Sequence, residues 1–198
     1  MNCISQRILK GRLFYSVLIT FNVVFLFVLV GCNRNVDIRN KIETMKSFPI
    51  NLDTSDMLLY NNEFVSDSLV DTSKLKLIIY MDSTECMPCY LKSMVEWQSF
   101  DNLIDKYKGQ LAFVFILEPK DGTKDQVANH FIDIPKIKMP IYLDKSHLFK
   151  SNNKFLPEEK QYHVFLIDEN NNVLLVGNPL LNPHVCDIMY KIIDNKLK

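Results

Sequence analysis

A pair of cysteines between an apolar run and a helical pattern constrains this chain most. Leu75 to Met81 is apolar except for Lys76, which predicts a central strand covered on both faces. After a short polar loop the chain reads Cys86-Met87-Pro88-Cys89, and helical spacing follows from Tyr90 to Lys108. Cysteines three positions apart close too small a loop to restrict the unfolded chain much, so they predict a redox couple rather than a structural bridge.

The position of the pair predicts which thiol attacks a substrate disulfide and which resolves the mixed disulfide. The nucleophile in thiol–disulfide exchange is the thiolate, and a helix N-terminus lowers the pKa of a cysteine beside it. Cys86 stands where the helix is expected to begin, and Pro88 fits a first helical turn. We therefore predict that Cys86 attacks and that Cys89 resolves the mixed disulfide.

Further segments complete an α/β pattern. Strands are predicted at Phe48–Leu52, Met57–Tyr60, Leu111–Leu117 and Pro140–Leu143, with a hairpin of Val164–Ile167 and Val173–Val176. Helices are predicted at Thr123–Phe131, at Ser146–Lys150 and after Asn182, the expected N-cap. This order predicts a mixed central sheet flanked by helices, with the sulfurs at the carboxyl end of a central strand.

The first 31 residues have the form of an export signal. They carry Arg7, Lys10 and Arg12 but no acid, then an apolar stretch that ends in Leu29-Val30-Gly31-Cys32. This ending looks like a bacterial lipoprotein box, which implies a lipidated Cys32 with several acyl chains. We expect a signal peptide at 1–31, a lipidated tether at 32–46 and a globular domain at 47–198. The alternative to a cleaved signal peptide is an uncleaved membrane anchor. The tether is expected to be either a short helix or a solvated stalk.

The charge balance argues against one class of function, and the remaining cysteines, Cys3 and Cys186, are not expected to be catalytic. The first 31 residues hold three of the 23 basic side chains, which leaves 20 against 23 acidic ones, and this balance argues against a nucleic-acid binder. Cys3 is expected to leave with the signal. Cys186 falls in a predicted terminal helix, where a buried inert thiol is favoured over a regulatory or intermolecular bridge.

From about residue 70 to 198 the chain resembles the thioredoxin superfamily, in the style of exported, tethered bacterial thioredoxin-like lipoproteins. The resemblance implies an exposed attacking Cys86, a resolving Cys89 and a peptide-binding groove beside them. Two features depart from the family pattern. Its cis-proline falls on Tyr162 or His163, neither of which is proline, and Glu85 replaces its aromatic residue before the first cysteine.

Three polar residues are candidate modulators of the pair. Asp82 or Glu85 could handle protons, although solvation of the loop is an equally good explanation. A negative charge at Glu85 should raise the pKa of Cys86, which would partly oppose the helix. His163 would face the sulfurs if the resemblance holds, where an imidazolium could stabilise the thiolate; a histidine packed at a strand end is the alternative.

These features predict thiol–disulfide exchange on exported proteins, as a reductase that acts with a redox partner and without cofactor or metal. The expected location is a bacterial membrane, with the domain lipid-anchored and facing the periplasm or cell surface. A thioredoxin-fold binding or assembly module with little turnover is the first alternative. A thiol peroxidase is less favoured, because such enzymes need an arginine near the thiolate and Arg34 and Arg39 both fall in the tether. One Cys-x-x-Cys is only half a zinc site.

Overall fold

The structure, a computed structural model, describes residues 35–60, 68–85, 94–120 and 137–198. Contacts divide the chain into two units, Met1–Glu43 and Thr44–Lys198. In the first unit residues 35–43 are helical and mostly exposed, and Lys41 Nζ lies 2.8 Å from Asp37 one turn away. This part of the predicted tether is therefore a polar helix. No helix among the described residues is both long and apolar enough to cross a bilayer.

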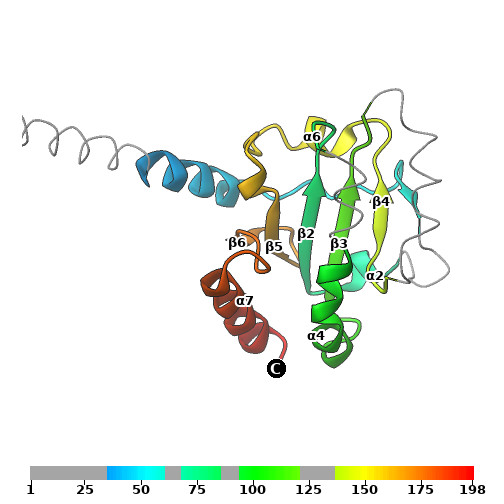
Figure 1. The fold of residues 1–198 in the computed structure, drawn as a ribbon, viewed down its shortest axis with the longest axis vertical. Coiled ribbons are helices and arrows are strands. Elements are labelled where there is room, and N and C mark those ends of the chain that lie inside the picture. The colour runs from blue at the N-terminus through cyan, green and yellow to red at the C-terminus, as the bar shows by residue number, and fades with distance from the viewer. Residues whose placement is uncertain (1–34, 61–67, 86–93, 121–136) are drawn as a thin grey trace, which may run out of the picture. The chain divides into compact units, whose positions relative to one another are not determined.

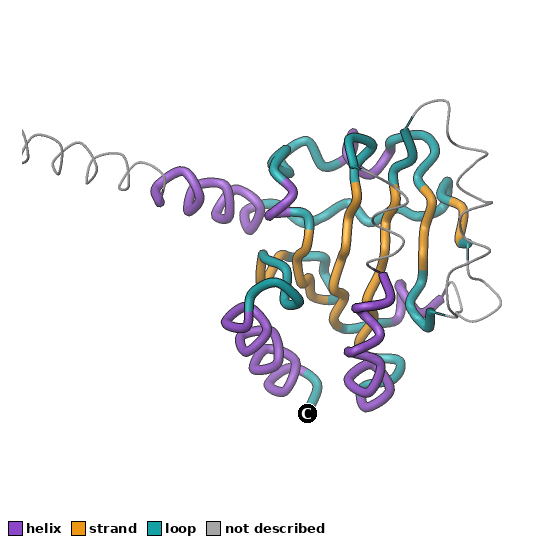
Figure 2. Tube along the Cα trace, viewed as in Figure 1, coloured by secondary structure: helices purple, strands orange, loops and turns teal. Residues whose placement is uncertain are grey.

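The second unit is built on one six-stranded mixed sheet (Figures 1 and 2). Its strand order is β1-β4-β3-β2-β5-β6. β2, β3 and β4 run parallel, whereas β1 pairs antiparallel with β4, and β5 pairs antiparallel with both β2 and β6. The strands are β1 (Leu58–Leu59), β2 (Leu75–Met81), β3 (Leu111–Leu117), β4 (Ile141–Leu143), β5 (Val164–Asp168) and β6 (Val173–Val176).

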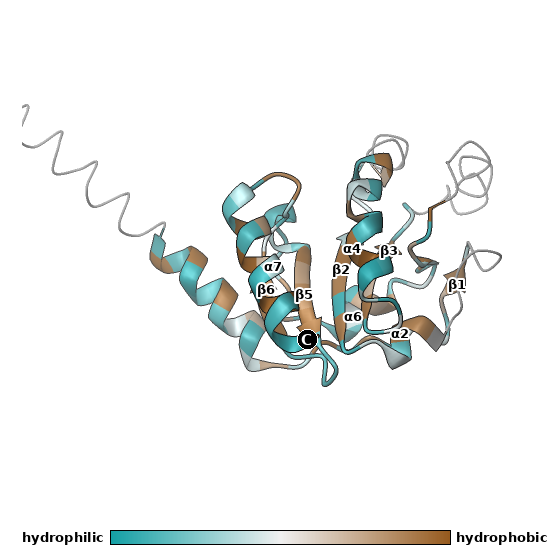
Figure 3. Cartoon of the chain, turned by 90° about the horizontal axis from the view of Figure 1, so that it is seen from below, coloured by the Kyte–Doolittle hydropathy of each residue, from teal (hydrophilic) through white to brown (hydrophobic). Residues whose placement is uncertain are grey.

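Both faces of the sheet are covered, as the unbroken apolar runs predict. Side chains alternate between faces along a strand. Leu77, Ile79, Phe113 and Phe115 share one core cluster with Trp97 of η1 (Met94–Phe100) and with residues of α4 (Asp101–Lys106) and α7 (Pro183–Lys196). Figure 3 shows α4 and α7 on the same side of the sheet.

The opposite face is covered by a different set of short helices. The Tyr80 ring packs on Phe149 of α6 (Leu148–Asn152), with ring centroids 4.9 Å apart. Val70 of α2 (Ser68–Thr72) is also buried. Both helices are only five residues long, so packing rather than intrinsic propensity maintains them.

Three local features of the backbone follow directly from the residue type at each position. Gly109 has a φ of 78° after α4, the left-handed conformation expected of a glycine stop. Asn171 in the hairpin turn has a φ of 62°. The Asn182 side chain caps α7 by accepting from the His184 and Val185 amides, with Pro183 at the first helical position.

The predicted edge strand at Phe48–Leu52 is wrong. Pro49 has no amide hydrogen, and the buried Asn153 side chain takes the role of a neighbouring strand. Its Oδ1 accepts from the Asn51 amide at 2.8 Å, and its Nδ2 donates to the Asn51 carbonyl at 2.9 Å. A side chain 102 positions away in the sequence therefore satisfies this backbone.

Of the helix predicted for Tyr90–Lys108, the described part is the 3-10 segment η1 followed by α4, which ends at Lys106. Met94, Trp97 and Phe100 are buried at intervals of three, the spacing that a 3-10 helix places on one side. The predictions missed α2 and the short 3-10 helix η2 (Lys160–Tyr162). The helix predicted at Thr123–Phe131 lies outside the described residues.

Candidate functional site

The loop that leads to the cysteine pair begins at the carboxyl end of β2, near the centre of the sheet. Asp82 organises this loop: its Oδ1 accepts from the Thr84 amide at 2.8 Å and from Thr84 Oγ1 at 2.5 Å. The Glu85 amide donates to the Asp82 carbonyl at 3.1 Å, which closes a tight turn. Asp82 therefore stabilises the loop through hydrogen bonds, whereas its predicted role in proton handling stays a prediction.

Cys86 and Cys89 themselves lie outside the described residues, as does Cys32. Their assignment as attacking, resolving and lipidated cysteines therefore stays a prediction.

Glu85, the residue before Cys86, has a basic partner from another part of the chain. Its Oε2 lies 3.2 Å from Lys160 Nζ, and only 16% of its side chain is exposed. The ammonium group supplies an opposite charge at short range, which offsets part of the field of the carboxylate. The unfavourable effect of Glu85 on a nearby thiolate is therefore smaller than its sequence position alone suggests.

His163 is packed at the start of β5. It is only 2% exposed, its ring lies 5.0 Å from that of Tyr80, and its Nε2 is 2.9 Å from the Pro157 carbonyl oxygen. Because a carbonyl only accepts, Nε2 carries the proton in this bond. Nδ1 lies 3.9 Å from Asp82 Oδ2, beyond hydrogen-bonding distance. These contacts match the packed strand-end histidine.

The segment before β5 is an all-trans 3-10 turn, and no cis peptide bond occurs in the described part of the chain. The Tyr162 amide donates to the Glu159 carbonyl and the His163 amide to the Lys160 carbonyl, each at 3.0 Å. The His163 carbonyl accepts from the Tyr80 amide at 2.9 Å. The Tyr162 and His163 amides are therefore used within the turn, and the His163 carbonyl is used by β2.

A pocket of about 420 Å³ lies beside this turn. Its walls are apolar side chains from four separate segments, among them Ile79, Trp97, Val164 and Leu180. His163 also contributes, and Glu85 and Lys160 add charge. Tyr162, predicted with His163 to form a substrate groove, is 3% exposed and is not among the described residues that line the pocket.

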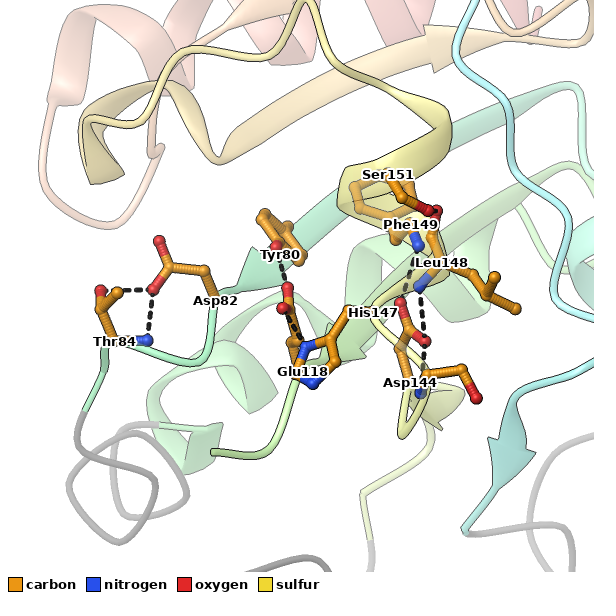
Figure 4. A network of polar contacts seen from close by, with 10 residues as sticks. Tyr80, Asp82, Thr84, Glu118, Asp144, His147, Leu148, Phe149 and Ser151 are labelled. Carbon is orange, nitrogen blue, oxygen red and sulfur yellow. Dashed lines mark hydrogen bonds and ion pairs between the residues drawn. The ribbon is translucent and has the colours of Figure 1, made fainter. Parts of the chain in front are cut away.

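A buried polar network at the same edge of the sheet was not predicted. Tyr80 Oη donates to one carboxylate oxygen of Glu118, and the other contacts Nδ1 of His147 (Figure 4). The Glu118 amide donates to the Met81 carbonyl at 2.9 Å, so this carboxylate lies beside the end of β2. Burial, followed by the hydrogen bond to Glu118 and its charge, raises the pKa of Tyr80 above its ordinary value.

One sequence signal could have revealed this network. An acidic residue directly follows each of the three parallel strands: Asp82 after β2, Glu118 after β3 and Asp144 after β4. The carboxyl ends of parallel strands meet at one edge, and all three carboxylates are buried there. Asp144 uses its oxygens to accept from the Leu148 and Phe149 amides, at 3.0 and 2.7 Å.

Cys186 lies in α7 and is half-buried. Burial, with a smaller effect of the Asp187 charge, raises the pKa of its thiol. A raised pKa lowers the fraction of thiolate and so makes Cys186 less reactive, and the residue is half-buried where a buried thiol was predicted.

Comparison with known proteins gives matches to solved structures alone, since no protein-family model and no curated protein sequence matches the chain. A thioredoxin-like protein from Bacteroides caccae is similar over 60% of this chain and 41% of its own length, with 16% identity and a TM-score of 0.41. The N-terminal domain of PilB from Neisseria gonorrhoeae is similar over 66% of this chain and 89% of its own, with 17% identity and a TM-score of 0.44.

A conserved protein of unknown function from Bacteroides fragilis is similar over 60% of this chain and 81% of its own length, with 16% identity and a TM-score of 0.40. At such identities and scores these likenesses are no basis for assigning an activity. The sheet itself has the predicted form: it is mixed, its central strand leads to the cysteine segment, and the chain closes with an antiparallel hairpin and a helix. The described chain therefore has the α/β fold class that the sequence predicted, a mixed central sheet flanked by helices.

Proposed function

We propose that this chain carries out thiol–disulfide exchange through Cys86 and Cys89, as a reductase of exported proteins. The observation that carries the proposal is the place of the motif in the sequence. The cysteines follow directly on the loop of residues 82–85, which begins at the carboxyl end of the central strand β2. Sites of α/β proteins commonly lie at this edge of the sheet.

The proposed reaction transfers two electrons to a substrate disulfide. The Cys86 thiolate attacks one substrate sulfur, which forms a mixed disulfide and releases the other substrate sulfur as a thiolate. Cys89, once deprotonated, attacks the Cys86 sulfur and releases the second substrate thiolate, so the substrate leaves as a dithiol. The chain is left with a Cys86–Cys89 disulfide, which a second dithiol protein must reduce.

Trapping of the mixed disulfide tests this proposal. With Cys89→Ser the resolving step is lost, so an adduct to a disulfide-bearing substrate such as insulin should accumulate and disappear with dithiothreitol. Cys86→Ser should form no adduct. Cys186→Ser is the matched control, because it removes a described thiol outside the motif and should reduce insulin at the rate of the unmodified chain. Insulin reduction by Cys86→Ser at that rate would contradict the proposal.

We also propose that the protein is exported and held on a bacterial membrane through lipid on Cys32. The support is the basic start, the apolar stretch and the terminal Leu29-Val30-Gly31-Cys32. Radiolabelled palmitate should be incorporated into the expressed protein and be absent from Cys32→Ala, whereas Cys3→Ala should label normally. Equal labelling of Cys32→Ala would exclude this anchor.

A binding module with little turnover is the second candidate. The trans turn at Lys160–Tyr162, whose backbone hydrogen bonds are internal, favours it, because the resemblance implies a cis-proline backbone that helps to hold a substrate peptide. Failure of insulin reduction together with failure to trap an adduct with Cys89→Ser would favour this module.

A further inference from the structure

The pocket beside the turn of residues 160–163 has an apolar interior and a charged rim. Trp97 and Val164 are nearly fully buried in its walls, at 3% and 7% exposed, whereas Leu181 at its edge is 79% exposed. A pocket of about 420 Å³ falls in the range of sites that bind a small ligand or a few side chains. Its interior therefore favours an apolar group.

The backbone around the pocket offers few groups to an added peptide strand. The Tyr162 and His163 amides are already used within their turn. In the segment after β6, the Leu180 amide donates to Asn178 Oδ1 at 2.9 Å, and the Leu181 amide donates to the Asn178 carbonyl at 3.2 Å. Strand addition depends on such main-chain groups, so recognition here has to come from side chains.

Among the described residues of its lining, the pocket carries two carboxylates, Glu85 and Glu96, and one ammonium group, that of Lys160. Glu85 and Lys160 form an ion pair at 3.2 Å and largely cancel each other. Glu96, the remaining carboxylate of the lining, is exposed, and no ion pair to it occurs among the described residues. A cationic group at the mouth of the pocket would therefore be favoured over an anionic one.

We infer that this pocket binds an apolar side chain of a partner polypeptide with a neighbouring Lys or Arg placed toward Glu96. The inference deepens the proposed function and rests on it for the identity of the partner as a substrate. The binding itself needs no cysteine and is recognised through side chains.

Fluorescence offers a direct readout, because Trp97 is the one tryptophan of the sequence and lies in the pocket wall. The full chain in lipid nanodiscs is titrated with three end-capped peptides: Gly-Leu-Lys-Gly, Gly-Leu-Glu-Gly and Gly-Ser-Lys-Gly. The Leu-Lys peptide should bind with a Kd at least about five-fold lower than either of the others, since it alone satisfies both the apolar wall and the acidic rim.

Two substitutions at exposed residues, each with a matched control, test the charge preference and the apolar contact separately. Glu96→Lys should abolish or reverse the preference for Leu-Lys over Leu-Glu, whereas Glu169→Lys, on the exposed hairpin turn, should leave it unchanged. Leu181→Ser should weaken binding of the Leu-Lys peptide several-fold, whereas Leu58→Ser, at 51% exposure elsewhere, should not. Equal binding of the three peptides, or a preference that survives Glu96→Lys, would overturn the inference.

The same titration on the Cys86→Ser/Cys89→Ser double variant separates the two proposals. Retention of the Leu-Lys preference there is expected, because the pocket acts through side chains other than the thiols. Peptide selectivity without insulin reduction by the unmodified chain would reject the proposed function and leave the inference standing. Insulin reduction without peptide selectivity would support the proposed function and overturn the inference about the pocket.

Discussion

Glu118 is the residue on which the buried polar contacts beside β2 converge. Its carboxylate is contacted by Tyr80 and His147, and its amide binds the end of β2. A carboxylate that is 5% exposed needs such partners, because burial without them carries a high desolvation cost. The network is therefore part of what fixes the sheet edge from which the cysteine loop departs.

Removal of one donor tests this role of Glu118. Tyr80→Phe keeps the ring that packs on Phe149 but removes the hydroxyl donor, so the free energy of unfolding should fall by about 1–3 kcal/mol. Urea denaturation followed by circular dichroism measures the change. Tyr190→Phe, at an exposed tyrosine of α7, is the control and should change stability little. A loss for Tyr80→Phe no greater than that of the control would contradict the role.

At the scale of elements, α4 and α7 are joined by a polar contact above the sheet. Tyr107, which ends α4, donates from Oη to Asp194 Oδ1 of α7 at 2.6 Å, and Lys106 Nζ lies 3.4 Å from the same oxygen. The hydrogen bond from Tyr107, assisted by Lys106, lowers the pKa of Asp194 below its ordinary value of 3.8.

This contact predicts a pH dependence with a definite sign. A carboxyl group with a lowered folded-state pKa stabilises the fold above pH 3.8, and the stabilisation is lost as pH falls through the folded-state value. Asp194→Asn should therefore be less stable than the unmodified chain at pH 6, and the difference should shrink at pH 3. Urea denaturation at both pH values checks this, with Asp56→Asn as a control for loss of an exposed carboxylate. An equal difference at both pH values would refute the linkage.

The strands also show where a local sequence pattern is enough to predict secondary structure and where it is not. Two seven-residue runs, apolar except for Lys76, predicted β2 and β3 residue for residue, because strands covered on both faces carry apolar side chains at nearly every position. The stretch at Phe48–Leu52 alternates like a strand, yet Asn153 satisfies its backbone instead. No local pattern reports a partner so distant in the sequence.

At the scale of the whole molecule, the described fold agrees with what the order of segments predicted, whereas the site agrees only in part. His163 lines a pocket, whereas the roles of Glu118, His147 and Lys160 were not predicted. Each of these residues becomes part of the site through the tertiary fold, which brings the ends of several strands together. The acidic residue after each parallel strand was a readable signal, but its meaning depends on knowing that those strands are neighbours.

The reduction potential of the Cys86/Cys89 couple tests the central claim most directly. The full-length Cys186→Ser chain would be equilibrated with dithiothreitol buffers of known potential, and its thiols counted by alkylation and intact mass. We expect one two-electron transition that is lost in both Cys86→Ser and Cys89→Ser, with a potential nearer to about −270 mV, as in a reductant, than to about −120 mV, as in a strong oxidant. Absence of a transition that depends on both cysteines would contradict a redox pair, and a potential near −120 mV would contradict a reductase.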